Sequence, residues 1–202
     1  MKKASVFHET YHQYLIEIAE IVLQDKAKHL GASYGNNGLT LQFYDTKYMI
    51  SSDGVVSAHH NDAPFAIKVI LCKYVLMARE FTTSFPEKWM SYREFKDSGP
   101  LISYFANNTN KTIELSYTGK LSALRERCKI IGGTELKSES YDLSFLFKAL
   151  PKIPVLLNFN DSDELFPSAC SILFNSDAEK YLDMECLAMV GTYLTGLLVT
   201  NK

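Results

Sequence analysis

Residues 141–160 read YDLSFLFKALPKIPVLLNFN and contain two apolar runs, 141–149 and 153–160. The break between them, Leu150-Pro151-Lys152, holds a proline, which has no N–H for a sheet ladder and favours a turn. Short apolar runs bounded by such a break are typical of buried strands. This stretch therefore predicts a β-hairpin that carries part of the core.

The chain after the hairpin predicts one more strand and a closing helix. The strand is expected near residues 168–174 and the helix from Asp183 to Val199. Within the helix the apolar residues recur at helical spacing, as Met184, Leu187, Ala188, Gly191, Leu194 and Leu198.

The N-terminal part predicts a helix followed by a meander of strands. One helix is expected from about residue 5 to 30, because an apolar stripe at helical spacing precedes Gly31, a natural helix stop. A turn rich in glycine and asparagine, 35–38, then leads into strands at 39–44 and 47–51.

The middle of the chain predicts further helices. Pro64 opens one that runs through Met77, since the missing N–H of a proline costs nothing in the first helical turn. A short aromatic segment, 89–95, precedes two more helices at 101–108 and about 112–130.

The predicted order of elements is helix, strands, helices, strands, helix. Strands do not alternate strictly with helices, which favours the α+β class over a doubly wound parallel sheet. No internal repeat or long linker is visible, and 202 residues suffice for one sizeable core. We expect a single α+β domain over residues 1–202, with a mostly antiparallel sheet flanked by helices.

Composition narrows the classes of function. The chain is 47% hydrophobic and 22% charged, with a net charge of −2 and no long run of one sign. A protein that tracks phosphates needs a basic surface, so nucleic acid is not expected as a partner. The N-terminal segment lacks the apolar core of a signal peptide, and no stretch approaches about 18 apolar residues. We expect no membrane partner and a cytoplasmic location.

The four cysteines are far apart and form no Cys-x-x-Cys pair. Cys72, Cys128, Cys170 and Cys186 lie mostly in apolar surroundings, where a reduced thiol behaves as a small hydrophobic group. A zinc knuckle or iron–sulphur cluster brings several thiolates together, usually from close sequence pairs. The pattern favours buried structural thiols.

A set of short motifs lies between about residues 65 and 198: Trp89–Phe95, Leu101–Phe105, Gly132-Gly133, Pro151–Pro154, Asp163–Pro167, Ile172–Phe174 and Tyr181-Leu182. Together they resemble the domain of unknown function 3786 family. The resemblance implies kinship with proteins found mostly in anaerobic bacteria and archaea, some of which carry an added iron–sulphur segment. It implies an accessory role in anaerobic redox or cofactor metabolism, with an iron–sulphur protein as a partner. Asn175 and Cys186 stand where the family pattern usually has acidic residues.

The sharpest chemical motif is His8-Glu9-Thr10-Tyr11-His12, which matches His-Glu-x-x-His. Two imidazoles four residues apart share a helix face and can bind zinc, while the glutamate acts as the general base. Against this, the position of the apolar stripe places His8 and His12 at its edge and Glu9 on the side of the helix that faces solvent. A zinc hydrolase also needs a third ligand from elsewhere, and the alternative is a pair of surface histidines.

The loop after the hairpin is acidic. Asp161, Asp163 and Glu164 directly follow a predicted strand, where carboxylates often bind hard cations. The loop lacks the glycine and the spacing of an EF-hand, and the simpler interpretation is a solvated turn. His59-His60 offers another metal candidate, although exposed loop histidines are the simpler interpretation there too.

Aromatic residues are numerous, with 12 Tyr, 12 Phe and one Trp. A ligand pocket combines apolar walls with a few polar groups. The candidates for such a pocket are Trp89, Tyr92, Arg93, Tyr104 and Phe105. Ordinary core packing is the alternative for each ring.

Three functions remain open from the sequence. The first is an accessory or small-ligand-binding domain with its ligand near Trp89, and the second is the zinc-dependent hydrolase built on His8 and His12. The third is a structural module that forms homo-oligomers through an exposed aromatic patch. No cofactor is indicated by the residues themselves.

Overall fold

The structure, a computed structural model, describes residues 2–59, 61–78 and 88–200. Its α-helices are α1 (Lys2–Ala19), α2 (Leu23–Leu30), α3 (Phe65–Met77), α4 (Ile102–Asn108), α5 (Asn110–Tyr117), α6 (Leu121–Ile130) and α7 (Met184–Val199). The strands are β1 (Ser33–Gly35), β2 (Gly38–Phe43), β3 (Thr46–Ser51), β4 (Gly54–Ser57), β5 (Trp89–Ser91), β6 (Thr134–Glu135), β7 (Leu143–Leu150), β8 (Ile153–Asn160) and β9 (Ala169–Asn175). Short 3-10 helices lie at η1 (Tyr92–Glu94), η2 (Gly99–Leu101) and η3 (Ala178–Lys180).

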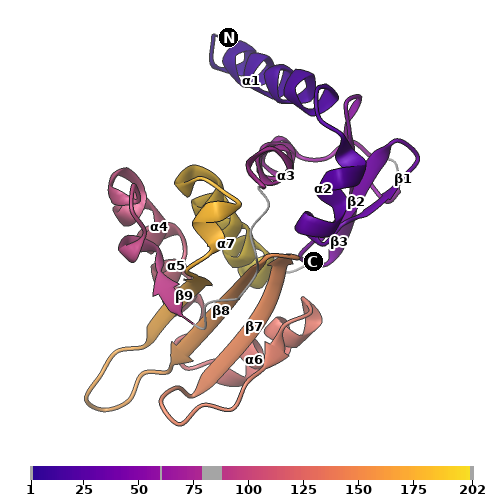
Figure 1. Ribbon diagram of the computed structural model, residues 1–202. Coiled ribbons are helices and arrows are strands. Elements are labelled where there is room, and N and C mark those ends of the chain that lie inside the picture. Colours follow the sequence, from indigo (N-terminus) through magenta and orange to yellow (C-terminus); the bar gives the residue numbers. More distant parts are fainter. Residues whose placement is uncertain (1, 60, 79–87, 201–202) are drawn as a thin grey trace.

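The strands form two antiparallel sheets. Sheet A has the order β1-β2-β3-β4, and sheet B has the order β5-β9-β8-β7-β6. Every strand pair in both sheets is antiparallel. The predicted α+β class is confirmed. The strands divide into two sheets because α3 separates the first meander from the rest of the chain (Figure 1).

The β7–β8 hairpin predicted from residues 141–160 is confirmed. Its register runs from Leu143 opposite Phe159 to Leu150 opposite Ile153, with an irregularity between Lys148 and Leu150. Side chains alternate across a strand, so one face of this hairpin carries phenylalanines that are fully buried, such as Phe145. This inner face forms one side of the hydrophobic core.

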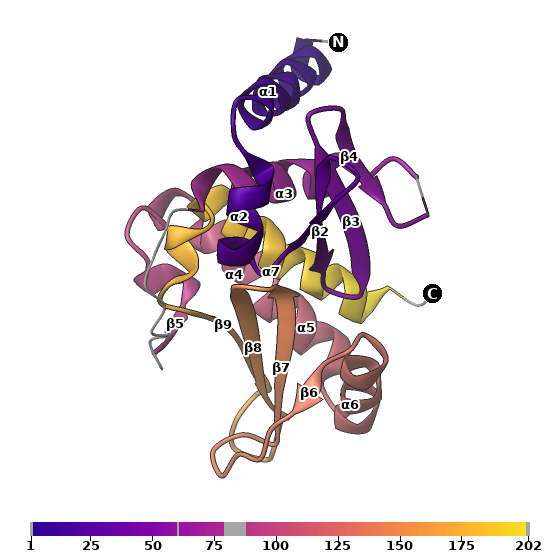
Figure 2. The same ribbon diagram turned by 45° about the vertical axis from the view of Figure 1, so that its right-hand side comes forward.

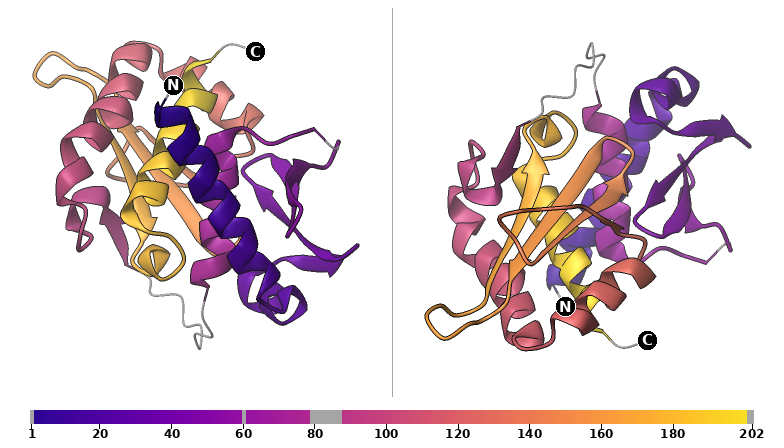
Figure 3. Two further views of the ribbon diagram at one scale, coloured as in Figure 1. Left: turned by 90° about the horizontal axis from the view of Figure 1, so that it is seen from above. Right: turned by 90° about the horizontal axis from the view of Figure 1, so that it is seen from below.

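Helices cover the inner faces of both sheets. Helix α7 lies against sheet B together with α4 and α5, while α3 lies between α7 and sheet A (Figures 1 and 2). Helix α1 crosses above α3, as the view from above shows (Figure 3). The buried side chains of both sheets and of these helices form one continuous cluster.

Two predicted helices are wrong in length. The helix expected over 5–30 is broken, because Val22 is extended between α1 and α2 and its side chain is 65% exposed. The helix expected over 112–130 is broken into α5 and α6 around Gly119, which has a φ of +72°. In each case the hydrophobic periodicity continues across a change of direction, so the pattern alone does not reveal the break.

Other boundaries agree with the predictions. Gly31 ends α2 in the left-handed conformation, with its N–H directed to the carbonyls of Ala27 and Lys28. Pro64 directly precedes α3, which ends at Met77. The meander is confirmed, and the structure adds β1 and β4 to its two predicted strands.

Candidate functional site

The outer faces of the two sheets meet at a corner beside the β2–β3 turn. Tyr44 fixes this corner, because its N–H donates to the carbonyl of Ala149 at 2.9 Å and its hydroxyl donates to the carbonyl of Val190 at 2.8 Å. Tyr44 has a φ of +50°, a conformation that a non-glycine residue adopts at a cost. Burial raises the pKa of its hydroxyl well above the usual range. These contacts set the angle between sheet A and β7.

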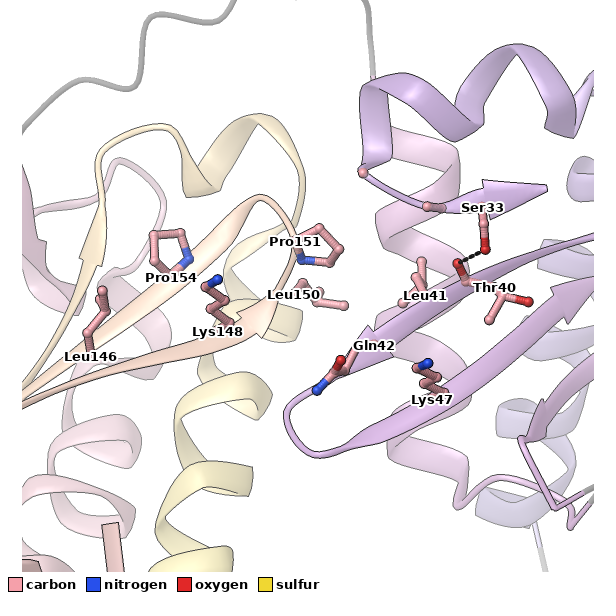
Figure 4. Close-up of a pocket in the computed structure, with 12 residues that line it drawn as sticks. Ser33, Thr40, Leu41, Gln42, Lys47, Leu146, Lys148, Leu150, Pro151 and Pro154 are labelled. Carbon is pink, nitrogen blue, oxygen red and sulfur yellow. Dashed lines mark hydrogen bonds between the residues drawn. The ribbon is translucent and has the colours of Figure 1, made fainter. Parts of the chain in front are cut away.

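A cavity of ≈ 730 Å³ occupies this corner (Figure 4). Its lining is Gly31, Ala32, Ser33, Thr40, Leu41, Gln42, Lys47, Leu146, Lys148, Leu150, Pro151 and Pro154. A second cavity of ≈ 400 Å³ shares Gln42, Leu146 and Lys148 with the first and continues towards Gly132. We call the two together the inter-sheet groove. The volume of the larger cavity, ≈ 730 Å³, is within the range typical of small-molecule sites.

The closed end of the inter-sheet groove depends on Gly31. A Cβ atom at this position would lie 2.7 Å from Cβ of Pro151, closer than such atoms approach one another. The glycine therefore lets the link between α2 and β1 touch the turn of the β7–β8 hairpin.

Tyr74 on α3 joins the same two segments through hydrogen bonds. Its hydroxyl donates to the carbonyl of Leu30 at 2.9 Å and accepts from the N–H of Lys152 at 3.1 Å. The side chain is fully buried in α3. One phenol thus ties α2, α3 and the hairpin turn together.

Two lysines give the larger cavity of the inter-sheet groove its charge, while the exposed Asp45 lines the smaller one. Lys47 on β3 and Lys148 on β7 lie on opposite walls, and both side chains are exposed to solvent (Figure 4). Within the described part of the chain neither ammonium forms an ion pair with a carboxylate. Leu146, Leu150 and Pro154 supply an apolar wall between them. Such a combination suits an anion with an apolar body.

Sequence reasoning missed this groove, although one signal was present. Lys148 interrupts an otherwise apolar run, and strand alternation puts it on the face opposite Phe145 and Phe147. Its partner wall is about 100 residues away in the sequence, and no local pattern indicates that the two faces meet.

The His-Glu-x-x-His motif lies on the outer side of α1. The side chains of His8, Glu9 and His12 are all exposed, whereas Tyr11 turns inward and its hydroxyl accepts from the N–H of Val55 at 3.0 Å. Among the described residues no three His, Cys, Asp or Glu side chains come together in a way that could hold a metal ion. The third zinc ligand required by the hydrolase hypothesis is thus absent from this part of the structure.

The acidic loop between β8 and β9 uses its carboxylates to hold its own backbone. Asp161 accepts from the N–H of Gly119 at 2.7 Å, and Asp163 accepts from the N–H groups of Leu165 and Phe166, both at 2.7 Å. These two backbone bonds lower the pKa of the Asp163 carboxyl. Glu164 is exposed.

The five residues of the aromatic candidate pocket separate into different environments. Tyr92 and Phe105 are 2% and 3% exposed and stack on one another, with their ring centroids 4.4 Å apart. Arg93 and Tyr104 point to solvent, and Trp89 is half-buried on β5. The structure brings two of the five together as packed core rather than as the lining of a cavity.

The remaining candidates are structural or exposed. Cys72, Cys128 and Cys186 are buried, and burial raises the pKa of the Cys72 and Cys128 thiols to about 12, which keeps them protonated. His59 is exposed in a turn, and His60 lies outside the described residues.

Comparison with models of known protein families gives a match to this chain. The sequence model of the domain of unknown function 3786 family matches residues 23–196, which cover sheet A, α3, sheet B and most of α7. The chain belongs to the domain of unknown function 3786 family. The matched region of this family member contains the whole inter-sheet groove but excludes α1 and its histidines. Neither a curated protein nor a solved structure matches the chain significantly.

In this member of the domain of unknown function 3786 family, none of the helices within 2–59, 61–78 and 88–200 is both long and apolar enough to span a membrane.

Proposed function

We propose that this chain is a ligand-binding domain whose inter-sheet groove takes a small anion with an apolar body. The observation that carries the proposal is the pair of lysines, Lys47 and Lys148, which approach one cavity of ≈ 730 Å³ from two different sheets. Leu146 and Pro154 offer contact area for the apolar part of such a ligand, and Gln42 and Thr40 offer polar contacts.

The wider role that goes with this proposal is an accessory one. The resemblance of the sequence to its family suggests a cytoplasmic protein in anaerobic redox or cofactor metabolism, which works beside an iron–sulphur protein. The zinc hydrolase is not carried forward, because no observation on the described residues favours it.

A pair of matched fluorescent probes tests the groove. The anion 8-anilinonaphthalene-1-sulfonate and its uncharged analogue N-phenyl-1-naphthylamine share an aromatic body and differ by one sulfonate. We expect the double variant Lys47→Glu/Lys148→Glu to bind the anion about 10-fold more weakly, since exposed charge pairs contribute up to about 1 kcal/mol each. Binding of the neutral probe is expected to change less than about 2-fold.

Lys96→Glu provides the matched control. Lys96 is exposed and lines a different cavity of ≈ 700 Å³ near Met184 and Glu185. This variant is expected to bind both probes like the wild type. Equal binding of the anion by the wild type and the double variant would reject the proposed function.

A further inference from the structure

The β8–β9 loop ends in a preformed apolar turn. The carboxylate of Asp163 accepts from the N–H groups of Leu165 and Phe166, while its own N–H donates to the carbonyl of Phe166 at 3.0 Å. These bonds close the turn on itself and direct the side chains of Leu165 and Phe166 outward. The two side chains, which we call the apolar tip, are 82% and 67% exposed.

The base of the same loop is fixed to its surroundings. Asp161 donates from its N–H to the carboxylate of Asp142 at 2.8 Å and accepts from the N–H of Gly119 at 2.7 Å. The hydroxyls of Thr118 and Ser168 lie 2.6 Å apart. The apolar tip is therefore presented on an anchored support, which lowers the entropy that binding would cost.

An apolar pair held open to water in this way calls for a partner surface. Scattered single apolar residues on a surface are ordinary, but two adjacent large ones at these exposures make a contact element. Glu164 is exposed beside them and adds a negative charge. The complementary surface is an apolar depression with positive charge at its rim.

The inter-sheet groove has this chemistry. In the larger cavity the half-buried Leu146 and Pro154 form an apolar wall, and Lys47 and Lys148 supply positive charge, while Asp45 lies in the smaller cavity next to Gly132. A chain does not reach its own groove with the apolar tip, because the β8–β9 loop projects from the end of sheet B opposite the β7–β8 turn (Figures 1 and 3). We propose that the apolar tip of one copy of this chain seats in the inter-sheet groove of a second copy.

This contact is head-to-tail, so each copy offers one tip and one groove, and association can continue to rings or chains. The inference rests on the proposed function in one respect, since it assigns a second occupant to the same groove. Self-association then competes with the small anion, and a ligand that fills the groove releases the neighbouring copy.

Complementation between two variants tests the contact. The tip variant is Leu165→Ser/Phe166→Ser, and the groove variant is Lys47→Glu/Lys148→Glu. We expect light scattering after size exclusion to show a wild-type mass that rises with concentration, while each variant stays monomeric to at least about 10-fold higher concentration. Mixed together, the variants retain one working tip and one working groove and form a 1:1 dimer that grows no further.

Ile16→Ser/Val22→Ser is the matched control, since it removes two exposed apolar side chains far from the tip, at 43% and 65% exposure. It is expected to associate like the wild type. A wild type that stays monomeric, or a mixture of the tip and groove variants that forms no dimer, overturns the inference. Such a result does not bear on the probe titration. If instead the lysine substitutions leave anion binding unchanged and the mixed variants still form a 1:1 dimer, only the proposed small-anion ligand is rejected.

Discussion

At the scale of single residues, the groove is held by buried phenols that join segments far apart in the sequence. Tyr44 fixes sheet A to β7 and α7, and Tyr74 fixes α2 to the hairpin turn. Each hydroxyl forms a hydrogen bond with a backbone group that burial would otherwise leave without a partner. These residues look like ordinary core aromatics in the sequence, and their polar role appears only from their contacts.

Tyr74→Phe is expected to lower the free energy of unfolding by about 1–3 kcal/mol, because the carbonyl of Leu30 and the N–H of Lys152 lose their shared partner inside the protein. Urea unfolding followed by circular dichroism measures the change. Tyr104→Phe is the control, since that ring is 51% exposed and its loss of a hydroxyl should leave stability within about 0.5 kcal/mol. Equal midpoints for the two variants would contradict the role given to Tyr74.

At the scale of elements, the position of α7 depends on a glycine where α4 approaches it. A Cβ atom at Gly191 would lie 2.5 Å from Cε2 of Phe105. Phe105 cannot retreat easily, because it is buried and its ring stacks on that of Tyr92. The same helix contains Gly196, where an added Cβ would meet nothing within 4 Å.

The two glycines of α7 should therefore respond to alanine with opposite signs. Gly191→Ala is expected to destabilise the protein by about 1–3 kcal/mol through overpacking. Gly196→Ala is expected to leave stability unchanged or to raise it by up to about 1 kcal/mol, since alanine is the better helix former. Thermal or urea unfolding of both variants measures the two changes. Stabilisation by both substitutions would show that helix propensity rather than packing dominates at Gly191, and destabilisation by both would contradict the open space at Gly196.

At the scale of the whole molecule, both sheets pack on one continuous core. Helix α3 contacts α1, α7 and sheet A. Neither sheet therefore has a hydrophobic core that is separate from that of the other. A protein arranged in this way should unfold as one unit.

We expect the fluorescence of Trp89 and the far-ultraviolet circular dichroism to give the same urea midpoint. Trp89 is the single tryptophan and reports on sheet B, while the circular dichroism also reports on the helices packed against sheet A. Agreement within experimental error supports one cooperative domain over the chain. A separate, earlier transition in circular dichroism would show that α1, α2 and sheet A unfold first.

Local patterns in the sequence suffice to predict the α+β class, the β7–β8 hairpin, the start of α3 after Pro64 and the end of α2 at Gly31. Hydrophobic period, proline and glycine act within a few residues, so they are readable locally. The same local signals fail where a helix bends without losing its period, as between α1 and α2 or at Gly119. The short motifs also indicated the family, which the match over residues 23–196 confirms.

The candidate site, in contrast, depends on how the two sheets pack against each other. Lys47 on β3 and Lys148 on β7 are separated in the sequence by the helices α3 to α6, and their convergence depends on the angle at which sheet A meets β7. That angle is set by Tyr44, Tyr74 and the close approach of Gly31 to Pro151. The sequence pointed instead to His8, His12 and the aromatic segment near Trp89, because local motifs are visible there. A site built from two strand faces has no local signature, since alternation fixes which face a side chain takes but not what that face meets.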